Sequence, residues 1–309
     1  MEYNNPFIID NWKTCYINLD GRKDRKENIE SELRKQGINA ERFPALTDKD
    51  FDKFIDLKLG RRNIFPLHCS KKDTAPLESI PGEWGCTFSH YSILKKHLNT
   101  GSQKILAIFE DDAHFCSDFK KRLQYLENQF DLEWDIFYLG CACALIYDQK
   151  TNIKHVWRIG DIAYCTQAML INPKSIQKII RLMELYAPNA SVIDNLYTHL
   201  IPHLKMYYFV PGMVSQNSLL VGDIGGRIDN TYSFTKIFGP HVFAENLDGF
   251  DYWKTSKFVL YPRKYFYVTL YKIESNLGKI GLFLKNRFPV IYKIIKSIPP
   301  FCFRKQANF

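Results

Sequence analysis

Residues 104–114, KILAIFEDDAH, decide the fold class of this chain. Five consecutive apolar residues, 105–109, run directly into the carboxylates Glu110, Asp111 and Asp112. An uninterrupted apolar run of this length is typical of a strand that is buried on both faces, as in a parallel sheet covered by helices. The stretch therefore predicts an α/β fold in which three acids stand at the carboxyl end of a central strand.

These three acids are candidates for a binding site, because ligands of open α/β sheets bind at the carboxyl ends of the strands. Adjacent carboxylates repel one another, and partial burial raises the cost of their charge. A divalent cation offsets both effects, and Mn²⁺ or Mg²⁺ held by one or two carboxylates together with substrate phosphates is a familiar arrangement. The alternative is a solvated acidic turn that caps the next helix, near 117–130.

The chain before this strand reads as strand, helix, strand, with a strand at 13–19, a charged amphipathic helix at 22–37 and a short strand at 40–45. This order opens a parallel α/β sheet. Arg22 and Arg25 follow the first strand, on the rim where a phosphate would lie, and the planar guanidinium suits phosphate. Two arginines at a helix start are also common as solvated surface residues.

The chain after an irregular stretch at 46–80 supplies further elements and candidate residues. A helix is predicted at 82–99, and its polar residues Glu83, Ser89 and His90 indicate that it borders a pocket. Asp194 is the one acid of a short helix at 191–200. The remaining predictions are helices at 118–130 and 172–186, strands at 134–139, 162–171 and 205–210, and a polar, glycine-bearing loop at 214–227.

Charge divides the chain into two parts. Residues 261–309 hold ten Lys or Arg and one acid, so they carry the whole net charge of +9, while the first 260 residues balance to zero. We therefore expect a domain at 1–255 and a basic amphipathic tail at 256–309, and no nucleic-acid-binding body. Lysines and arginines interleaved with large apolar residues at 272–303 indicate binding to an anionic membrane surface. The alternative is a C-terminal helix packed on the body.

Further features concern the cellular location. The eight cysteines form no CxxC pair, which favours free thiols in a reducing compartment. The N-terminal sequence lacks a secretory signal pattern, and no run of 18 uncharged apolar residues exists. We expect a cytoplasmic protein that binds peripherally to the inner face of the membrane.

Six motifs occur along the chain in the order YINLDGRKDR at 16–25, ERFPAL at 41–46, GEWGCTFSH at 82–90, ILAIFEDD at 105–112, WDIFYLG at 134–140 and VSQNSLLVGDIGGR at 214–227. This order resembles glycosyltransferase family 25, which includes bacterial lipooligosaccharide galactosyltransferases and collagen hydroxylysine galactosyltransferases. The resemblance covers about 13–227. It implies a GT-A fold with a Rossmann-like, mostly parallel sheet, a UDP-sugar donor, a divalent metal and inversion at the anomeric carbon.

The resemblance also assigns roles to residues of this chain. Asp112 is the expected direct metal ligand, with Glu110 as a second ligand, and Glu110 or Asp111 lies near the ribose of the donor. Asp194 is the candidate catalytic base, although a helix-capping or salt-bridging role is equally open. The other residues expected to bind the donor are Arg22, Arg25, Glu83, Ser89, His90 and Gln216.

The sequence thus predicts an inverting, metal-dependent transferase that moves galactose, or else glucose, from UDP to a hydroxyl of a glycan such as lipopolysaccharide or lipooligosaccharide, with lipid-linked glycans among the expected acceptors. A collagen-type hydroxylysine transferase is an alternative of the same class. Two other classes remain open at this point, a metal-dependent sugar-nucleotide hydrolase and an inactive glycan-binding protein of the same fold.

Overall fold

The structure of the protein is a computed structural model, and it describes residues 5–47, 49–50, 81–140, 149–160, 165–187 and 193–217. Most of the irregular stretch predicted at 46–80, the rest of the glycine-bearing loop and the basic tail lie outside these residues. All structural statements below concern the described residues.

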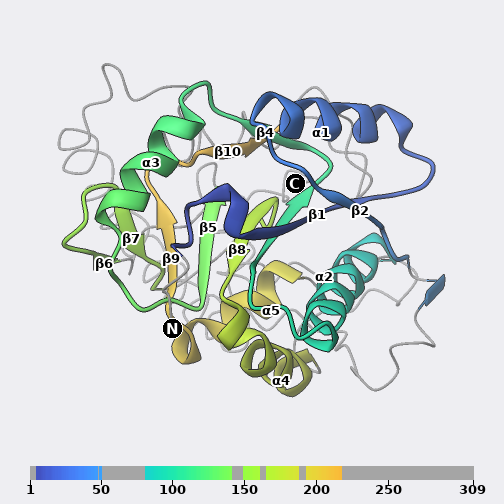
Figure 1. Cartoon of the computed structure of the whole chain (residues 1–309). Helices are drawn as coiled ribbons and strands as arrows, with labels where there is room; N and C mark the ends of the chain where they lie inside the picture. The colour runs from blue at the N-terminus through green and yellow to red at the C-terminus, as the bar shows by residue number, and fades with distance from the viewer. Residues whose placement is uncertain are drawn as a thin grey trace, which may run out of the picture. The chain divides into compact units, whose positions relative to one another are not determined.

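The elements alternate between strands and helices in the order that the sequence predicts, with additional short strands (Figure 1). The strands of the main sheet are β1 (Trp12–Asn18), β2 (Glu41–Pro44), β3 (Ile105–Glu110), β5 (Ile136–Gly140), β6 (Gln149–Lys150), β7 (Val156–Arg158), β8 (Ala168–Ile171) and β9 (Met206–Phe209). The helices are α1 (Lys23–Lys35), α2 (Pro81–Asn99), α3 (Phe119–Gln129), α4 (Ile176–Tyr186) and α5 (Ile193–Leu200).

The strands pair in the order β2-β1-β3-β8-β5-β9-β7-β6. β2, β1 and β3 are parallel to one another, and β5 is parallel to β9. β8 is antiparallel to both of its neighbours, β3 and β5. β3 and β5 therefore run in the same direction, which β1, β2 and β9 share. The sheet is therefore mixed but mostly parallel, and the predicted α/β, Rossmann-like fold is confirmed.

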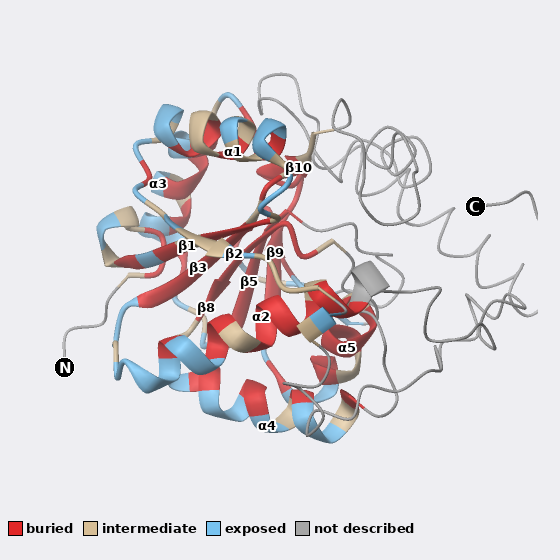
Figure 2. Ribbon diagram, turned by 90° about the vertical axis from the view of Figure 1, so that its right-hand side faces the viewer, coloured by how far each residue is buried: buried red, intermediate tan, exposed pale blue. Residues whose placement is uncertain are grey.

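Side chains of β3 alternate between the two faces of the sheet, as the pleat of a strand requires. Ile105, Ala107 and Phe109 join one core cluster with apolar residues of α1 and α3. Leu106 and Ile108 are also fully buried, on the opposite face. Figure 2 shows the sheet between α1 and α3 on one side and α2, α4 and α5 on the other. The apolar run thus reflects burial on both faces.

A two-stranded ribbon, which the sequence does not predict, lies at the end of the sheet. β4 (Ala113–Phe115) pairs antiparallel with β10 (Val214–Gln216). β10 lies within 214–227, the stretch that we interpreted from the sequence as a loop. A Cβ on Gly140 would lie 1.6 Å from the carbonyl oxygen of Val214, so only glycine lets β10 pass the end of β5. Buried Arg122 of α3 donates to the carbonyl oxygens of Pro211 and Gly212, which precede β10.

One predicted strand has the wrong extent. We expected a strand at 162–171; residues 162–164 lie outside the described part of the structure, and in the rest of the range β8 spans only Ala168–Ile171. β8 is also antiparallel to its neighbours. A fully apolar strand has no polar–apolar alternation, so its sequence does not indicate the direction in which it pairs. The described cysteines, Cys15, Cys86, Cys116 and Cys165, are free thiols. Among the described helices, none is long and apolar enough to span a membrane.

Candidate active site at the carboxyl end of β3

The three acids after β3 diverge instead of forming one carboxylate cluster. Phe109 faces α1 and α3, so the pleat directs the next side chain, Glu110, to the opposite face, toward α2. Asp111 then points to the side of α1, where its partners are Asn18 and Arg25. The acidic tripeptide therefore connects the two helical layers at the edge of the sheet.

Arg25 is the counter-ion on the α1 side. Its Nη1 lies 2.7 Å from Asp111 Oδ1, and its Nη2 lies 3.2 Å from Asp112 Oδ2. Arg25 precedes Ile29 by one helical turn, so it shares the buried face of α1 and is only 8% exposed. The rest of the helix holds this guanidinium at the acids before any ligand arrives.

Three asparagines complete the α1 side, and the sequence analysis did not select any of them. Asn18 donates to Asp111 Oδ2 at 2.8 Å, and Asn28 donates to the Asp111 carbonyl oxygen at 3.2 Å. The backbone N–H of Asn217 donates to the Asp112 carbonyl oxygen at 2.6 Å, and its side chain donates to Asn28 Oδ1 at 3.0 Å. A usable signal existed for Asn28, which lies three residues after Arg25 on the same helical face.

Asp112 has the least favourable surroundings for a negative charge among the three acids, as its raised pKa indicates. Burial and the neighbouring charge of Glu110 raise its pKa from 3.8 to about 7, against the opposing effect of Arg25. Its Oδ1 is buried and has no hydrogen-bond partner among the described residues. A buried carboxylate oxygen without a donor is costly, and a bound cation would remove that cost.

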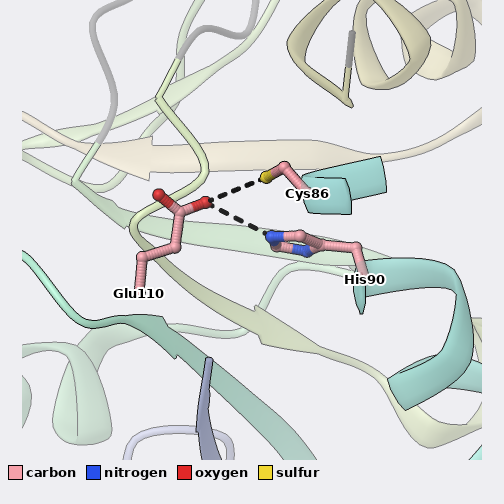
Figure 3. Close-up of side chains that lie close together, drawn as sticks. All are labelled: Cys86, His90 and Glu110. Atoms are coloured by element: carbon pink, nitrogen blue, oxygen red, sulfur yellow. Dashed lines mark hydrogen bonds and ion pairs between the residues drawn. The ribbon is translucent and has the colours of Figure 1, made fainter. Parts of the chain in front are cut away.

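Glu110 lies among different partners on the α2 side. Its Oε1 accepts a hydrogen bond from Thr166 Oγ1 at 2.7 Å and lies 3.3 Å from His90 Nε2. Cys86 Sγ lies 3.8 Å from the same oxygen, and Figure 3 shows both α2 side chains pointing at it. Burial raises the pKa of Glu110, but the contacts with His90 and Thr166 outweigh it and the pKa is lowered. Glu110 is therefore held as a carboxylate.

Asp194, on α5, belongs to the same side of the sheet as Glu110. Burial raises the pKa of the Cys86 thiol well above its usual value, with Glu110 and then Asp194 adding to the effect. Asp194 also contributes to the raised pKa of Tyr138, after burial and Tyr197. The structure thus brings Asp194 within electrostatic reach of the residues around Glu110.

Comparisons with known proteins identify the family of the chain. Residues 12–194 match the family model described as glycosyltransferase family 25 (LPS biosynthesis protein). The chain belongs to glycosyltransferase family 25. The matched region contains Arg25, the acids at 110–112, Cys86, His90, Thr166 and Asp194.

Curated relatives include both active and inactive members of the family. The chain is 30% identical to procollagen galactosyltransferase 2 of Homo sapiens over 169 residues, which are 53% of this chain and 26% of the relative. It is 30% identical to procollagen galactosyltransferase 1-A of Xenopus laevis, over 53% of this chain and 27% of the relative. It is 32% identical to the probable inactive glycosyltransferase 25 family member 3 of Bos taurus, over 40% of this chain and 21% of the relative. The matched part of the chain thus spans about a quarter of the length of these relatives.

Two of the predicted donor-binding residues of this family 25 chain make contacts with other parts of the protein. Arg22 pairs with Asp24 at 2.8 Å on the surface. Ser89 Oγ accepts the backbone N–H of Leu46 at 2.9 Å and donates to the Gly85 carbonyl oxygen at 2.7 Å. Ser89 therefore attaches the segment after β2 to α2, and its contact with a donor stays a prediction.

The last two predicted residues lie at the borders of the site. Gln216 ends β10 and is paired in register with Ala113, directly after the acidic tripeptide. Glu83 lies in the first turn of α2, and its side chain is outside the described part of the structure.

Proposed function

We propose that this transferase moves a hexose, in the first place galactose, from a UDP-sugar to a hydroxyl of a glycan with inversion at the anomeric carbon. One observation carries the proposal: Arg25, Asp111 and Asp112 form a buried charged cluster at the carboxyl end of β3, in a chain of family 25. The procollagen relatives are named galactosyltransferases, which supports galactose as the sugar.

The residues present fit a divalent cation at Asp112. Its Oδ1 is buried without a partner among the described residues, and carboxylate oxygens are the ligands that Mn²⁺ and Mg²⁺ prefer. Asp112 would hold the cation, which when bound stabilises negative charge on the diphosphate. Glu110 directs Oε1 toward α2, so the second ligand predicted from the sequence would use its other oxygen.

The residues of the chain have separate tasks in this proposal. Arg25 supplies fixed positive charge where the leaving diphosphate gains its electron pair, and it keeps Asp111 and Asp112 in place. The acceptor hydroxyl attacks the anomeric carbon while the bond to the diphosphate breaks, and Asp194 takes the hydroxyl proton. One in-line displacement of this kind needs one base and no covalent intermediate.

The acceptor is proposed from the family description and the tail. The matching family model is described with LPS biosynthesis, which supports a lipid-linked saccharide as the acceptor. The basic tail at 256–309 would dock the cytoplasmic enzyme on the anionic inner face of the membrane, next to such an acceptor. Replacing Lys279, Lys285 and Arg287 by glutamine should then weaken cosedimentation with anionic liposomes. The same change of charge at Lys121, Lys178 and Arg181 should leave it unchanged.

A screen of UDP-sugars with Mn²⁺, read as UDP release with and without acceptor, tests the function. Acceptor-dependent release from UDP-galactose, with a lipid-linked saccharide preferred over a collagen peptide, supports the proposal. Equal release without acceptor identifies a sugar-nucleotide hydrolase. A second candidate, an inactive glycan-binding protein, is favoured by the inactive relatives, and failure to bind UDP with Mn²⁺ would select it.

A further inference from the structure

Three side chains on the α2 side of the sheet supply a different set of metal ligands from the acids around Asp112. Cys86 and His90 lie one turn apart on α2, so both face the end of β3. One thiol, one imidazole and one carboxylate, from Glu110, converge there, and their ligand atoms all lie within 4.8 Å of one another (Figure 3). This donor set contains sulfur and nitrogen, whereas the set at Asp112 consists of oxygen alone.

The spacing of the three ligand atoms suits a tetrahedral ion. Zinc bonds of about 2.0–2.3 Å place tetrahedral ligand atoms about 3.3–3.8 Å apart. Glu110 Oε1 lies 3.3 Å from His90 Nε2 and 3.8 Å from Cys86 Sγ. These two separations match a tetrahedral ion, and Cys86 Sγ and His90 Nε2 lie within 4.8 Å of each other.

The surroundings meet the other requirements of such a site. Thr166 Oγ1 donates to Glu110 Oε1 at 2.7 Å, and a hydrogen bond of this kind orients a ligating carboxylate. The His90 side chain is fully buried, whereas 20% of the Glu110 side chain is exposed to solvent. Three protein ligands with one open position are the pattern of a zinc site that exchanges water or substrate.

We propose that Cys86, His90 and Glu110 Oε1 bind Zn²⁺, in a site that shares only Glu110 with the cation site at Asp112. Binding replaces the contacts of the Sγ–H and Nε2–H groups with Glu110 by bonds from Sγ, Nε2 and the carboxylate to the ion. The thiol proton is released to solvent, and the Nε2 proton of the neutral imidazole is replaced by one on Nδ1, exchanged through solvent, so that Nε2 is free to bind the ion. The inference goes beyond the proposed function, because the site requires neither a sugar donor nor transfer.

Cobalt substitution in the full-length protein tests the site without reference to activity. Co²⁺ bound by a thiolate shows a sulfur-to-metal charge-transfer band, which an ion bound only by carboxylates at Asp112 does not give. The expected result is this band in the wild-type protein at one equivalent of Co²⁺, and its loss when Zn²⁺ is added. An absent band would overturn the proposal.

Two conservative variants assign the band to these residues. Cys86→Ser keeps a donor for Glu110, and His90→Gln keeps a side-chain N–H, so both preserve the contacts of the metal-free protein. Each should weaken Zn²⁺ binding by about a hundredfold or more, since loss of a ligand costs at least as much as loss of an outer partner. Cys15→Ser, in β1, and Asp112→Asn should retain the band. A band that survives Cys86→Ser, or disappears in Asp112→Asn, would place the ion elsewhere and contradict the proposal.

Discussion

Arg25 and Asp112 are in contact although 87 residues separate them in the sequence, with 3.2 Å between Nη2 and Oδ2. The same guanidinium binds Asp111 at 2.7 Å, so one arginine is the shared counter-ion of two buried acids that follow the central strand. These contacts attach the first helix to the site. The positive charge of Arg25 is therefore in place before a donor binds. A preorganised charge of this kind acts on the leaving group without the cost of reorganisation.

Replacing Arg25 by glutamine should destabilise the protein, because Asp111 and Asp112 would remain buried without their counter-ion. We expect a loss of about 3 kcal/mol in the free energy of unfolding, measured with urea. Arg22→Gln is the matched control, since Arg22 pairs with an exposed acid at the surface, and its loss should be much smaller. Equal losses in the two variants would contradict the structural role given to Arg25.

Replacing Asp194 by asparagine separates catalysis from donor binding. If Asp194 accepts the proton of the acceptor, transfer should fall about 10²-fold or more, because general-base catalysis contributes on this scale. Binding of UDP with Mn²⁺, followed by calorimetry, should remain as in the wild type. Unchanged transfer would make Asp194 structural, and lost UDP binding would move it to the donor site.

Replacing Gly140 by alanine tests the crossing of β10 over the end of β5. The added Cβ would meet the Val214 carbonyl oxygen, so the variant should lose at least about 2 kcal/mol of stability. Gly21→Ala is the control, because no atom lies within 4 Å of a Cβ at that position. Thermal and urea unfolding of both variants measure the difference, and an unaffected Gly140→Ala protein would rule out this packing.

His155 should make the protein sensitive to acid. Burial lowers the pKa of His155 from 6.5 to about 4, although its Nδ1 lies 2.7 Å from the Val210 carbonyl oxygen. The unfolded chain therefore binds a proton at a higher pH than the folded one, so stability is lost as pH falls from 6.5 to 4. The expected loss is at most about 3 kcal/mol.

Asparagine at position 155 cannot titrate, tolerates the positive φ of 70° found there, and can still donate to Val210. Urea unfolding of His155→Asn at several pH values should show a smaller decrease below pH 6.5 than the wild type. Parallel curves for the two proteins would show that another group causes the acid sensitivity.

The sequence predicts the acids of the site well because they directly follow a long apolar run. From local pattern alone, Glu110 and Asp112 could be placed at the end of a strand, and Arg25 at the start of the first helix. The pleat predicts that Glu110 and Asp111 point in opposite directions. The partners on each side could not be predicted, because they depend on which helices cover each face of the sheet.

Other parts of the site depend on contacts between distant segments and could not be predicted. Thr166 reaches Glu110 only because β8 inserts between β3 and β5. β4 and β10 have three residues each, too few for a periodic signal, and they are identified by pairing with each other. Ser89 was selected as a polar residue on an apolar helix, and the sequence does not reveal that its hydroxyl binds the backbone of Leu46 and Gly85; its contact with a donor stays a prediction.

The most direct test of the account measures UDP release from UDP-galactose by Asp112→Asn, with Mn²⁺ and a glycan acceptor. The substitution keeps the shape of the side chain but removes the charge that would hold the cation. We expect turnover to fall by about 10²-fold or more and Mn²⁺ affinity to be lost, with the thermal midpoint of the metal-free protein unchanged or raised. Asp24→Asn, at the surface, should behave as the wild type. An Asp112→Asn enzyme with wild-type turnover and Mn²⁺ affinity would contradict the account.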